Sequence, residues 1–317
     1  MQSNRRVFLC PPSSNPGGVS NFIDALLSEE DNVLRLDNPN SFMTIWMMIK
    51  CIKVSDEVYL NPSLQKKALI RDYLVSLYLR SRGVSYEVFW HGWDKSILEG
   101  FMWRNLLRKV SSGAIDSYVL NSAARFDFAM ATGKRAKMYR TKSSFYMSEN
   151  RAPKDNLLFS SRLVPKKRLD LALNLLSKLR FGANLTICGD GPSASKINEW
   201  CNQYQITPTA VESLGHVSGQ NYYEALSSSK LFLFPTAHPE GMPNVVLEAL
   251  GCQHLVFTSD QPFSLQLISN HTDTLFCFPL ESWVNKSLLI INGLKEVKFK
   301  YNEYQYGIEE VRKAIFE

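Results

Sequence analysis

A short apolar strand passes through a turn into a helix in the sequence Leu231-Phe-Leu-Phe-Pro-Thr-Ala-His-Pro-Glu-Gly-Met-Pro-Asn-Val-Val-Leu-Glu-Ala-Leu250. The turn falls at Pro239 to Met242. Pro243 suits the first helical position, because its fixed φ fits a helix and its missing N–H is not needed there. The free amides around Asn244 to Val246 then favour an anionic group such as a phosphate. This segment predicts a ligand-binding strand–helix unit of a parallel α/β sheet.

The same alternation of strands and helices extends in both directions along the chain. In the first half we expect strands at Val7–Cys10, Val33–Leu36, Glu57–Leu60, Tyr86–Trp90 and Ser117–Leu120. In the second half we expect strands at Leu157–Ser160, Leu185–Cys188, Leu231–Pro235, Leu255–Thr258 and Leu275–Phe278, with helices over 168–179 and near 193–203. The spacing of Ile70, Tyr73, Leu74, Leu77 and Tyr78 predicts one apolar helix face. The fold class is therefore α/β, with doubly wound parallel sheets and right-handed crossovers.

The length indicates two domains. At about 100–200 residues per domain, 317 residues form two units that can each bury a core. A composition of 45% apolar and 12% aromatic residues excludes a disordered or low-complexity chain. The composition changes near residue 150, so we expect Rossmann-like domains over 1–150 and 151–317. Ligands in this architecture bind at the carboxyl ends of the strands, in a cleft between such domains.

The excess positive charge belongs entirely to the first half of the chain. Residues 1–150 hold 20 basic and 14 acidic side chains, whereas residues 151–317 hold 16 of each. An amphipathic helix there carries Arg104, Arg108 and Lys109. Such a surface suits an anionic membrane face or a phosphate-bearing lipid, and an ordinary solvated face is the alternative. Nucleic acid is not an expected partner, because no recognition motif accompanies the charge.

The cysteines and the apolar segments indicate a cytoplasmic protein. The six cysteines form no CxxC or Cys/His pattern, which favours buried free thiols in a reducing compartment. The apolar stretch after Arg5 and Arg6 is too short for an export signal. The segment Phe42–Ile49 falls short of the roughly 18 residues of a membrane span. We expect at most peripheral contact with the inner face of the cell membrane.

Two pairs of charged residues suit a nucleotide-sugar. Glu240 and Glu248 flank the helix start with seven residues between them, and a carboxylate can accept paired hydrogen bonds from a sugar diol. Arg162 and Lys167 follow the strand that opens the second half, five residues apart, where a guanidinium and an ammonium can bind both phosphates of a diphosphate. Incidental carboxylates on a surface helix and a solvated basic turn are the alternatives.

Several glycines follow predicted strands. Gly189-Asp-Gly-Pro192 formally matches a dinucleotide fingerprint, although Pro192 removes an amide from the turn. A tight strand–helix turn explains Gly189 and Gly191 equally well. In Pro16-Gly-Gly-Val-Ser20, Gly17 and Gly18 would let backbone amides approach a ligand, or form a plain turn.

His91 ends the fourth strand, in Phe89-Trp-His-Gly-Trp-Asp94. A histidine there can hydrogen-bond a donor sugar or an acceptor hydroxyl, and a satisfied core histidine is the alternative. Asp94 is a second candidate for holding the acceptor.

Glu240-Gly-Met-Pro-Asn-Val-Val-Leu-Glu248 resembles the E-x7-E motif of the family 4 retaining glycosyltransferases, which use nucleotide-sugars and have the GT-B fold. Ser161-Arg-Leu-Val-Pro-Lys-Lys-Arg168 resembles the family's G-R-L-x-x-x-K-G loop, with Ser161 and Arg168 where glycines are usual. Gly189–Pro192 is similar to its G-D-G-P loop, and Leu214-Gly-His-Val217 to its L-G-x-V segment. The resemblance covers most of residues 155–260.

The resemblance implies a role for each motif. Glu240 would contact the donor sugar, Glu248 the ribose, and Arg162 with Lys167 the diphosphate. His91 would help to orient the sugar, and Asp94 would hold the acceptor. The residues implied in further donor contacts are Gly17, Gly18, Gly191, His216, Gly241, Met242, Pro243 and Asn244. Residues 151–317 would bind the donor and residues 1–150 the acceptor.

The implied enzyme transfers a sugar from a UDP- or GDP-sugar to a glycan or lipid-linked acceptor, with retention and no other cofactor. The resemblance and the basic first half suggest bacterial surface polysaccharide synthesis, such as O-antigen, capsule or lipopolysaccharide. No D-x-D motif stands in a strand–loop context, and Arg162, Lys167 and the helix amides can stabilise the leaving diphosphate, so we expect metal independence. A sugar-nucleotide epimerase and a non-catalytic nucleotide-binding protein remain alternatives.

Overall fold

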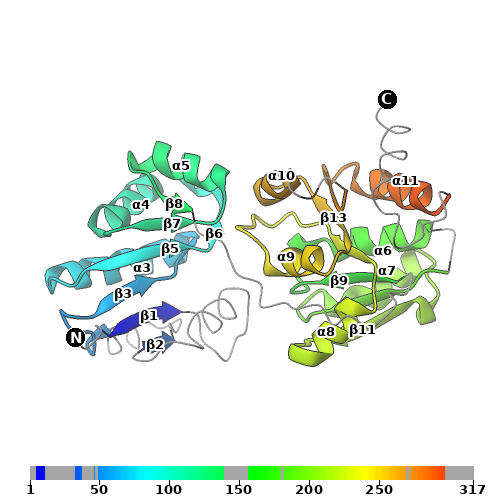
Figure 1. The fold of residues 1–317 in the computed structure, drawn as a ribbon, viewed down its shortest axis with the longest axis horizontal. Helices are drawn as coiled ribbons and strands as arrows, with labels where there is room; N and C mark the ends of the chain where they lie inside the picture. Colours follow the sequence, from blue (N-terminus) through cyan, green and yellow to red (C-terminus); the bar gives the residue numbers. More distant parts are fainter. Residues whose placement is uncertain are drawn as a thin grey trace. The chain divides into compact units, whose positions relative to one another are not determined.

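The computed structural model describes residues 5–10, 33–37, 46, 49–138, 156–179, 182–268, 271 and 273–296 (Figure 1). The chain contacts divide it into two compact units. The first consists of Met1–Ser144 and Pro239–Asn244, and the second of Phe145–His238 and Val245–Glu317. A short piece of the second half of the sequence therefore belongs to the first unit.

The first unit contains a six-stranded parallel sheet in the order β2-β1-β3-β5-β7-β8. Its strands are β1 (Arg6–Cys10), β2 (Val33–Asp37), β3 (Glu57–Leu60), β5 (Tyr86–Trp90), β7 (Ser117–Val119) and β8 (Lys137–Met138). Two further short strands, β4 (Ser63–Leu64) and β6 (Gly92–Trp93), continue beyond β3 and β5 and pair with each other. The order reverses next to β1, which is the topological switch point of such a sheet.

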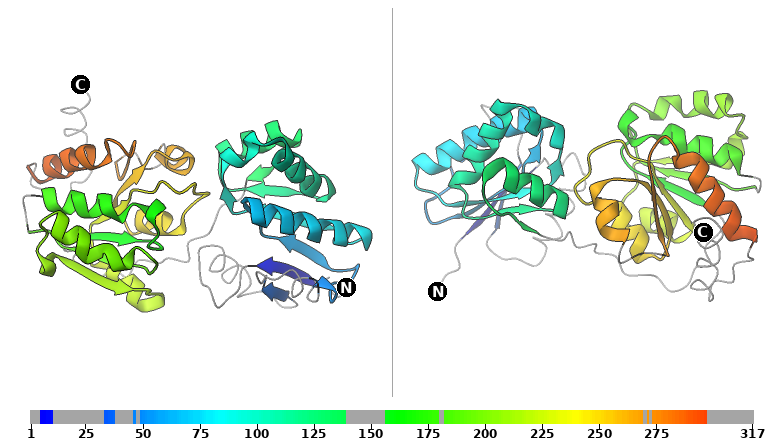
Figure 2. Two further views of the ribbon diagram at one scale, coloured as in Figure 1. Left: turned by 180° about the vertical axis from the view of Figure 1, so that it is seen from behind. Right: turned by 90° about the horizontal axis from the view of Figure 1, so that it is seen from above.

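Three described helices of the first unit pack side by side: α3 (Lys66–Ser81), α4 (Phe101–Gly113) and α5 (Ser122–Thr132) (Figure 2). The core beneath them includes the fully buried Tyr86, Trp90 and Phe128. The apolar spacing predicts α3, but only Tyr73 and Tyr78 of the predicted face pack against the core. Ile70, Leu74 and Leu77 are exposed, while Leu69, Asp72, Val75, Ser76 and Leu79 are buried. The ring centroid of Trp46 lies 4.8 Å from that of Tyr78.

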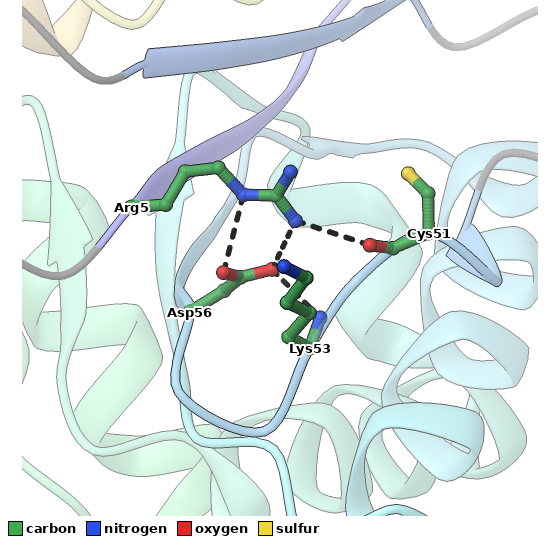
Figure 3. Close-up of polar contacts among 4 residues, drawn as sticks. All are labelled: Arg5, Cys51, Lys53 and Asp56. Carbon is green, nitrogen blue, oxygen red and sulfur yellow. Dashed lines mark hydrogen bonds and ion pairs between the residues drawn. The ribbon is translucent and has the colours of Figure 1, made fainter.

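An ion pair fastens the start of β1 to the segment before β3 (Figure 3). Arg5 Nη2 donates to Asp56 Oδ2 at 2.6 Å and to the carbonyl of Cys51 at 3.0 Å, and the Lys53 amide donates to Asp56 Oδ2 at 2.7 Å. Burial alone would raise the pKa of Asp56, but the hydrogen bonds from Arg5 and Lys53 outweigh burial and hold that pKa below its usual range. The anchored carboxylate aligns β1 with β3.

The second unit contains another six-stranded parallel sheet, in the order β11-β10-β9-β12-β13-β14. Its strands are β9 (Leu157–Ser160), β10 (Leu185–Cys188), β11 (Val211–Gly215), β12 (Leu231–Phe234), β13 (Leu255–Ser259) and β14 (Leu275–Phe278). Numbered along the chain this is the 3-2-1-4-5-6 order of a dinucleotide-binding fold, and its switch point lies between β9 and β12. The sequence expectation of doubly wound parallel α/β domains is confirmed.

The helices of the second unit are α6 (Leu169–Lys178), α7 (Ile197–Gln203), α8 (Gly219–Ser227), α9 (Asn244–Gly251), α10 (Pro262–Ile268) and α11 (Trp283–Glu296). Helices α6 and α11 pack together (Figure 2). Phe159, Phe257 and Trp283 are fully buried in the core. Buried apolar residues on β9, β10, β12 and β13 explain why the sequence predicts these central strands so well.

The sequence pattern misses β8 and β11. Strand β11 is Val-Glu-Ser-Leu-Gly at the edge of its sheet, with its three middle residues exposed, so no apolar run marks it. The expectation of buried cysteines holds for Cys188 and Cys201 but is wrong for the exposed Cys51; Cys252 and Cys277 are half-buried. The side chain of Cys10 lies outside the description. Within the described ranges, no helix combines the length and the apolarity that a membrane crossing needs.

Candidate active site

The switch point of the second sheet places the basic loop at the end of β9. Arg162 is exposed, whereas Lys167 is buried and its Nζ lies 4.8 Å from the centroid of the Phe234 ring, at the end of β12. The Ala237 amide, just beyond β12, donates to the Lys166 carbonyl at 2.7 Å. The basic loop is therefore fixed across the switch point, where ligands of such sheets bind.

Arg168 occupies the backbone position where the family usually has glycine. Its φ of 55° and ψ of 44° lie in the left-handed region, which costs a residue with a side chain about 1–2 kcal/mol. A bidentate pair with Asp170, at 2.8 to 3.2 Å, accompanies this conformation at the start of α6. The hydrogen bond to Asp170 also raises the pKa of Arg168. An arginine therefore adopts a left-handed conformation that favours glycine.

The glycines after β10 allow the loops after β9 and β10 to join. Gly189 and Gly191 have φ of 144° and 146°, and a side-chain carbon at Gly189 would overlap the carbonyl oxygen of Ser161. The Leu163 amide donates to the Asp190 carbonyl at 2.8 Å, and the Ser193 amide donates to the Leu163 carbonyl at 2.8 Å. This close backbone approach gives both glycines a structural role, and a donor contact by Gly191 remains a prediction.

The third loop of this edge carries His216. The Gly189 amide donates to the carbonyl of Gly215 at 2.7 Å, which joins the ends of β10 and β11. His216 follows directly and is exposed. Arg162, Lys167, Gly191 and His216 therefore lie on three connected loops at the carboxyl edge of one sheet.

Glu248 lies on α9, which begins one residue after Pro243 rather than at it. Its side chain is half-buried, and burial raises the pKa of Glu248. The nearby Tyr222 hydroxyl, from α8, favours the charged carboxylate and opposes that rise. Sequence reasoning missed Tyr222, because nothing in Asn221-Tyr-Tyr-Glu224 distinguishes it from its neighbour.

His91 and Asn61 occupy corresponding positions in the first unit, between β5 and β6 and between β3 and β4. Asn61 Nδ2 donates to the carbonyls of Leu9 and Tyr59 at 3.1 and 3.3 Å, so its Oδ1 faces His91 Nε2 at 2.8 Å. Nε2 is therefore the protonated ring nitrogen. Burial lowers the pKa of His91 to about 3, so the ring is neutral at physiological pH. Because Nε2 already has a partner in Asn61 and the ring is buried, this side of His91 resembles a satisfied core histidine.

Asp94 caps the short 3-10 helix η1 (Lys95–Glu99). Its Oδ1 accepts from the Ser96 amide at 3.1 Å and from the Ser96 hydroxyl at 2.6 Å. Asp94 thus has a structural role, and acceptor binding by it stays a prediction.

The first acid of the E-x7-E motif belongs to the first unit and the second acid to the second unit. Glu240, Met242, Pro243 and Asn244 are half-buried, and Gly241 is buried. Gly17 and Gly18 lie outside the described residues. In the part of the chain that the structure describes, no group of three or more His, Cys, Asp or Glu residues could hold a metal ion.

Residues 145–305, just over half of the 317-residue chain, match the model of the family "Glycosyl transferases group 1". The chain belongs to the group 1 glycosyl transferases. The expected family resemblance and glycosyltransferase activity are thereby confirmed. A search of the curated proteins found no significant match to the sequence of this group 1 glycosyl transferase.

Solved structures share the whole fold of this group 1 glycosyl transferase. HepE from Anabaena, in complex with UDP-glucose, matches with a TM-score of 0.74 at 16% sequence identity. The match covers 98% of this chain and 94% of the HepE chain. An α,α-trehalose-phosphate synthase from Burkholderia xenovorans, in complex with glucose-6-phosphate, matches with a TM-score of 0.70 at 10% sequence identity. The match covers 98% of this chain and 96% of the synthase chain. TarM from S. aureus has a TM-score of 0.60 at 16% identity and covers 86% of this chain and 54% of its own. The expected GT-B fold is confirmed.

Proposed function

We propose that this group 1 glycosyl transferase moves a sugar from a UDP- or GDP-sugar to a glycan or lipid-linked acceptor, with retention of the anomeric configuration. One observation carries the proposal: Glu248 on α9 and the basic loop of Arg162 and Lys167 border the switch point of a 3-2-1-4-5-6 sheet. Structural neighbours in complex with UDP and with UDP-glucose support a nucleotide-sugar donor. The proposed setting is synthesis of a bacterial surface polysaccharide.

Residues 151–317 would supply most of the donor site. Arg162 and Lys167 would bind the diphosphate, because a guanidinium and an ammonium match its two charged groups. Glu248 would accept hydrogen bonds from the ribose hydroxyls, and Glu240 from those of the donor sugar. The remaining proposed donor contacts are Gly17, Gly18, Gly191, His216, Gly241, Met242, Pro243 and Asn244.

The proposed reaction breaks the bond between the anomeric carbon and the phosphate oxygen, and both electrons leave with the phosphate. The acceptor oxygen then attacks the same face of the sugar, and its proton passes to the departing phosphate. Arg162 and Lys167 would stabilise the developing negative charge. His91, being neutral, would act as a hydrogen-bonding group, and Asp94, in residues 1–150, would help to hold the acceptor.

Metal independence is part of the proposal. The two cations and the amides at the start of α9 can together balance the charge of the leaving diphosphate. Transfer should therefore continue in excess chelator, and loss of transfer that Mg²⁺ or Mn²⁺ restores would contradict it.

The outer surface of α4 and α5 is the proposed site of peripheral contact with the inner face of the membrane. Arg104, Arg108 and Lys109 are exposed on α4. Four large apolar side chains are also exposed on these two helices: Phe101, Met102, Phe126 and Met130, with exposed fractions of 55–73%. Basic side chains attract anionic lipid, and exposed apolar side chains beside them can insert at the interface.

The decisive experiment incubates the protein with a panel of UDP- and GDP-sugars and glycan or lipid-linked acceptors, and follows the products by mass spectrometry. Sugar transfer supports the proposal, donor isomerisation without acceptor supports an epimerase, and binding without turnover supports a nucleotide-binding protein. NMR of the product's anomeric signal tests retention. Glu240→Ala should reduce kcat at least about 100-fold, whereas Glu281→Ala, which removes an exposed acid of the second unit, should not. Near-normal transfer by Glu240→Ala would exclude the assigned role.

A further inference from the structure

The segment that carries Glu240 is fastened to the first unit through the residue that follows it. Gly241 is buried, and the six residues Pro239–Asn244 belong to the first unit. Asn121 Nδ2 donates to the carbonyl oxygen of Gly241 at 2.9 Å. Asn121 itself is only 2% exposed, so this hydrogen bond is shielded from water.

Both ends of the Asn121 amide are used. Its Oδ1 accepts from the Ala124 amide at 2.8 Å and so caps the start of α5. Only the NH2 group can donate to a carbonyl and only the oxygen can accept from an amide, so the orientation of the side chain is unique. The helix cap therefore holds Nδ2 in position for Gly241.

The surroundings of Gly241 admit no side chain. A side-chain carbon there would overlap the carbonyl oxygen of His91 and would lie 2.5 Å from Leu120 Cδ1. His91 and Leu120 follow directly after β5 and β7, which are neighbours in the sheet. Two adjacent strand ends and the start of α5 thus enclose one glycine and bind its carbonyl oxygen.

The chain is also held shortly before Glu240, within the second unit. Thr236 is fully buried, and its carbonyl accepts from the Ser259 hydroxyl at 2.5 Å. The Ala237 amide donates to the Lys166 carbonyl, as described above. Only His238, Pro239 and Glu240 separate these contacts from Gly241, so Glu240 has little backbone freedom.

We propose that Asn121 is a positioning residue for Glu240. By binding the Gly241 carbonyl it holds the backbone that aims the Glu240 carboxylate. This inference rests on the proposed function, in which Glu240 contacts the donor sugar. A shift of about 1 Å in such a group can cost roughly 100-fold in rate, even when the altered residue does not touch the substrate.

Asn121→Asp separates this role from the helix cap. An aspartate still accepts from the Ala124 amide, because Asp caps helices as well as Asn does. It has no Nδ2 donor and turns an oxygen toward the Gly241 carbonyl. We expect kcat to fall about 10- to 100-fold at temperatures where the variant is folded, together with a lower melting temperature, because the buried carboxylate loses a donor. Gly241→Ala, whose methyl group meets His91 and Leu120, should give the same loss if Asn121→Asp folds poorly.

A binding measurement distinguishes positioning from a general structural effect. The affinity for UDP, whose main proposed contacts are Arg162, Lys167 and Glu248 of the second unit, should be nearly unchanged in Asn121→Asp. The extra affinity for UDP-glucose over UDP should disappear. If the donor panel shows that the enzyme uses a GDP-sugar, GDP and that GDP-sugar replace these two probes. Wild-type kcat together with a wild-type ratio of the two affinities would overturn the inference.

Measurements on the wild-type protein distinguish a failure of the Asn121 inference from a failure of the proposed function. A wild type that transfers no sugar contradicts the proposed function, while its preference for the nucleotide-sugar still decides the role of Asn121. A wild type without any such preference contradicts the contact of Glu240 with the donor sugar, on which the role of Asn121 depends.

Discussion

At the scale of single residues, Tyr222 offers the sharpest test of the donor site. Its hydroxyl stabilises the charged form of the Glu248 carboxylate and so opposes the rise of the pKa of Glu248 by burial. In Tyr222→Phe that opposition is lost, so the pKa of Glu248 rises further. If the charged carboxylate binds the ribose, UDP affinity falls when Glu248 becomes protonated. As the pH is lowered, this loss should therefore begin at a higher pH in the variant than in the wild type.

Titration calorimetry with UDP between pH 5 and 8 measures this shift. Tyr223→Phe is the matched control, because it removes a hydroxyl from the neighbouring half-buried residue. At pH 8 we expect a loss of roughly 3- to 10-fold in Tyr222→Phe, the size of an ordinary polar contact of about 0.5–1.5 kcal/mol. Identical pH curves for the two variants would show that Tyr222 does not act on Glu248.

At the scale of elements, the loop after β10 depends on its glycines. Gly189→Ala should destabilise the protein by more than about 2 kcal/mol, because it combines backbone strain of order 1–3 kcal/mol with overlap on the Ser161 carbonyl. Gly182→Ala is the control, since nothing lies within 4 Å of the added carbon and its φ is ordinary. Denaturant unfolding of both variants measures the difference, and equal stability would contradict the close approach of the two loops.

The anchor of β1 predicts a dependence of stability on pH. Asp56 has a lowered pKa in the folded protein, so its contribution is present above its unfolded pKa of about 3.9 and is lost as the pH falls through the folded value. Asp56→Asn should lower the melting temperature at pH 7, and its deficit relative to the wild type should shrink below about pH 4. Calorimetric scans from pH 3 to 7 test this, and a deficit that stays constant would contradict it.

Prediction from sequence succeeds for elements whose burial leaves a pattern in the chain. Strands β9 and β10 are buried at every residue and are predicted to the exact residue, whereas the exposed edge strand β11 leaves no such pattern. Helix α3 is predicted, but its buried side includes Asp72 and Ser76, which apolar spacing does not select. Tyr222 and Asn121 act through contacts between distant segments, and such contacts have no local signature.

At the scale of the whole molecule, the charge asymmetry between the two halves allows a test of the proposed membrane contact. Changing Arg104, Arg108 and Lys109 to Gln should reduce binding to vesicles with anionic lipid about tenfold or more, since each basic residue near such a surface contributes about 1 kcal/mol. Arg108 Nε also donates to the Ala131 carbonyl at 2.5 Å, so thermal unfolding must accompany the assay.

The matched control changes Lys178, Lys196 and Lys286, three exposed lysines of the second unit, to Gln. Co-sedimentation with phosphatidylglycerol-containing vesicles should separate the two triple variants. Equal binding by both would mean that the surface of α4 is merely solvated.

The membership of Pro239–Asn244 in the first unit also limits how the gene can be divided. A fragment that stops at Ser144 would lack Gly241, so the buried Nδ2 of Asn121 would lose its acceptor and Leu120 would lose a contact. A chimera that takes its second half from another glycosyl transferase brings in a foreign turn against His91 and Leu120. Recombination between relatives should therefore succeed only when those positions and that turn are inherited together.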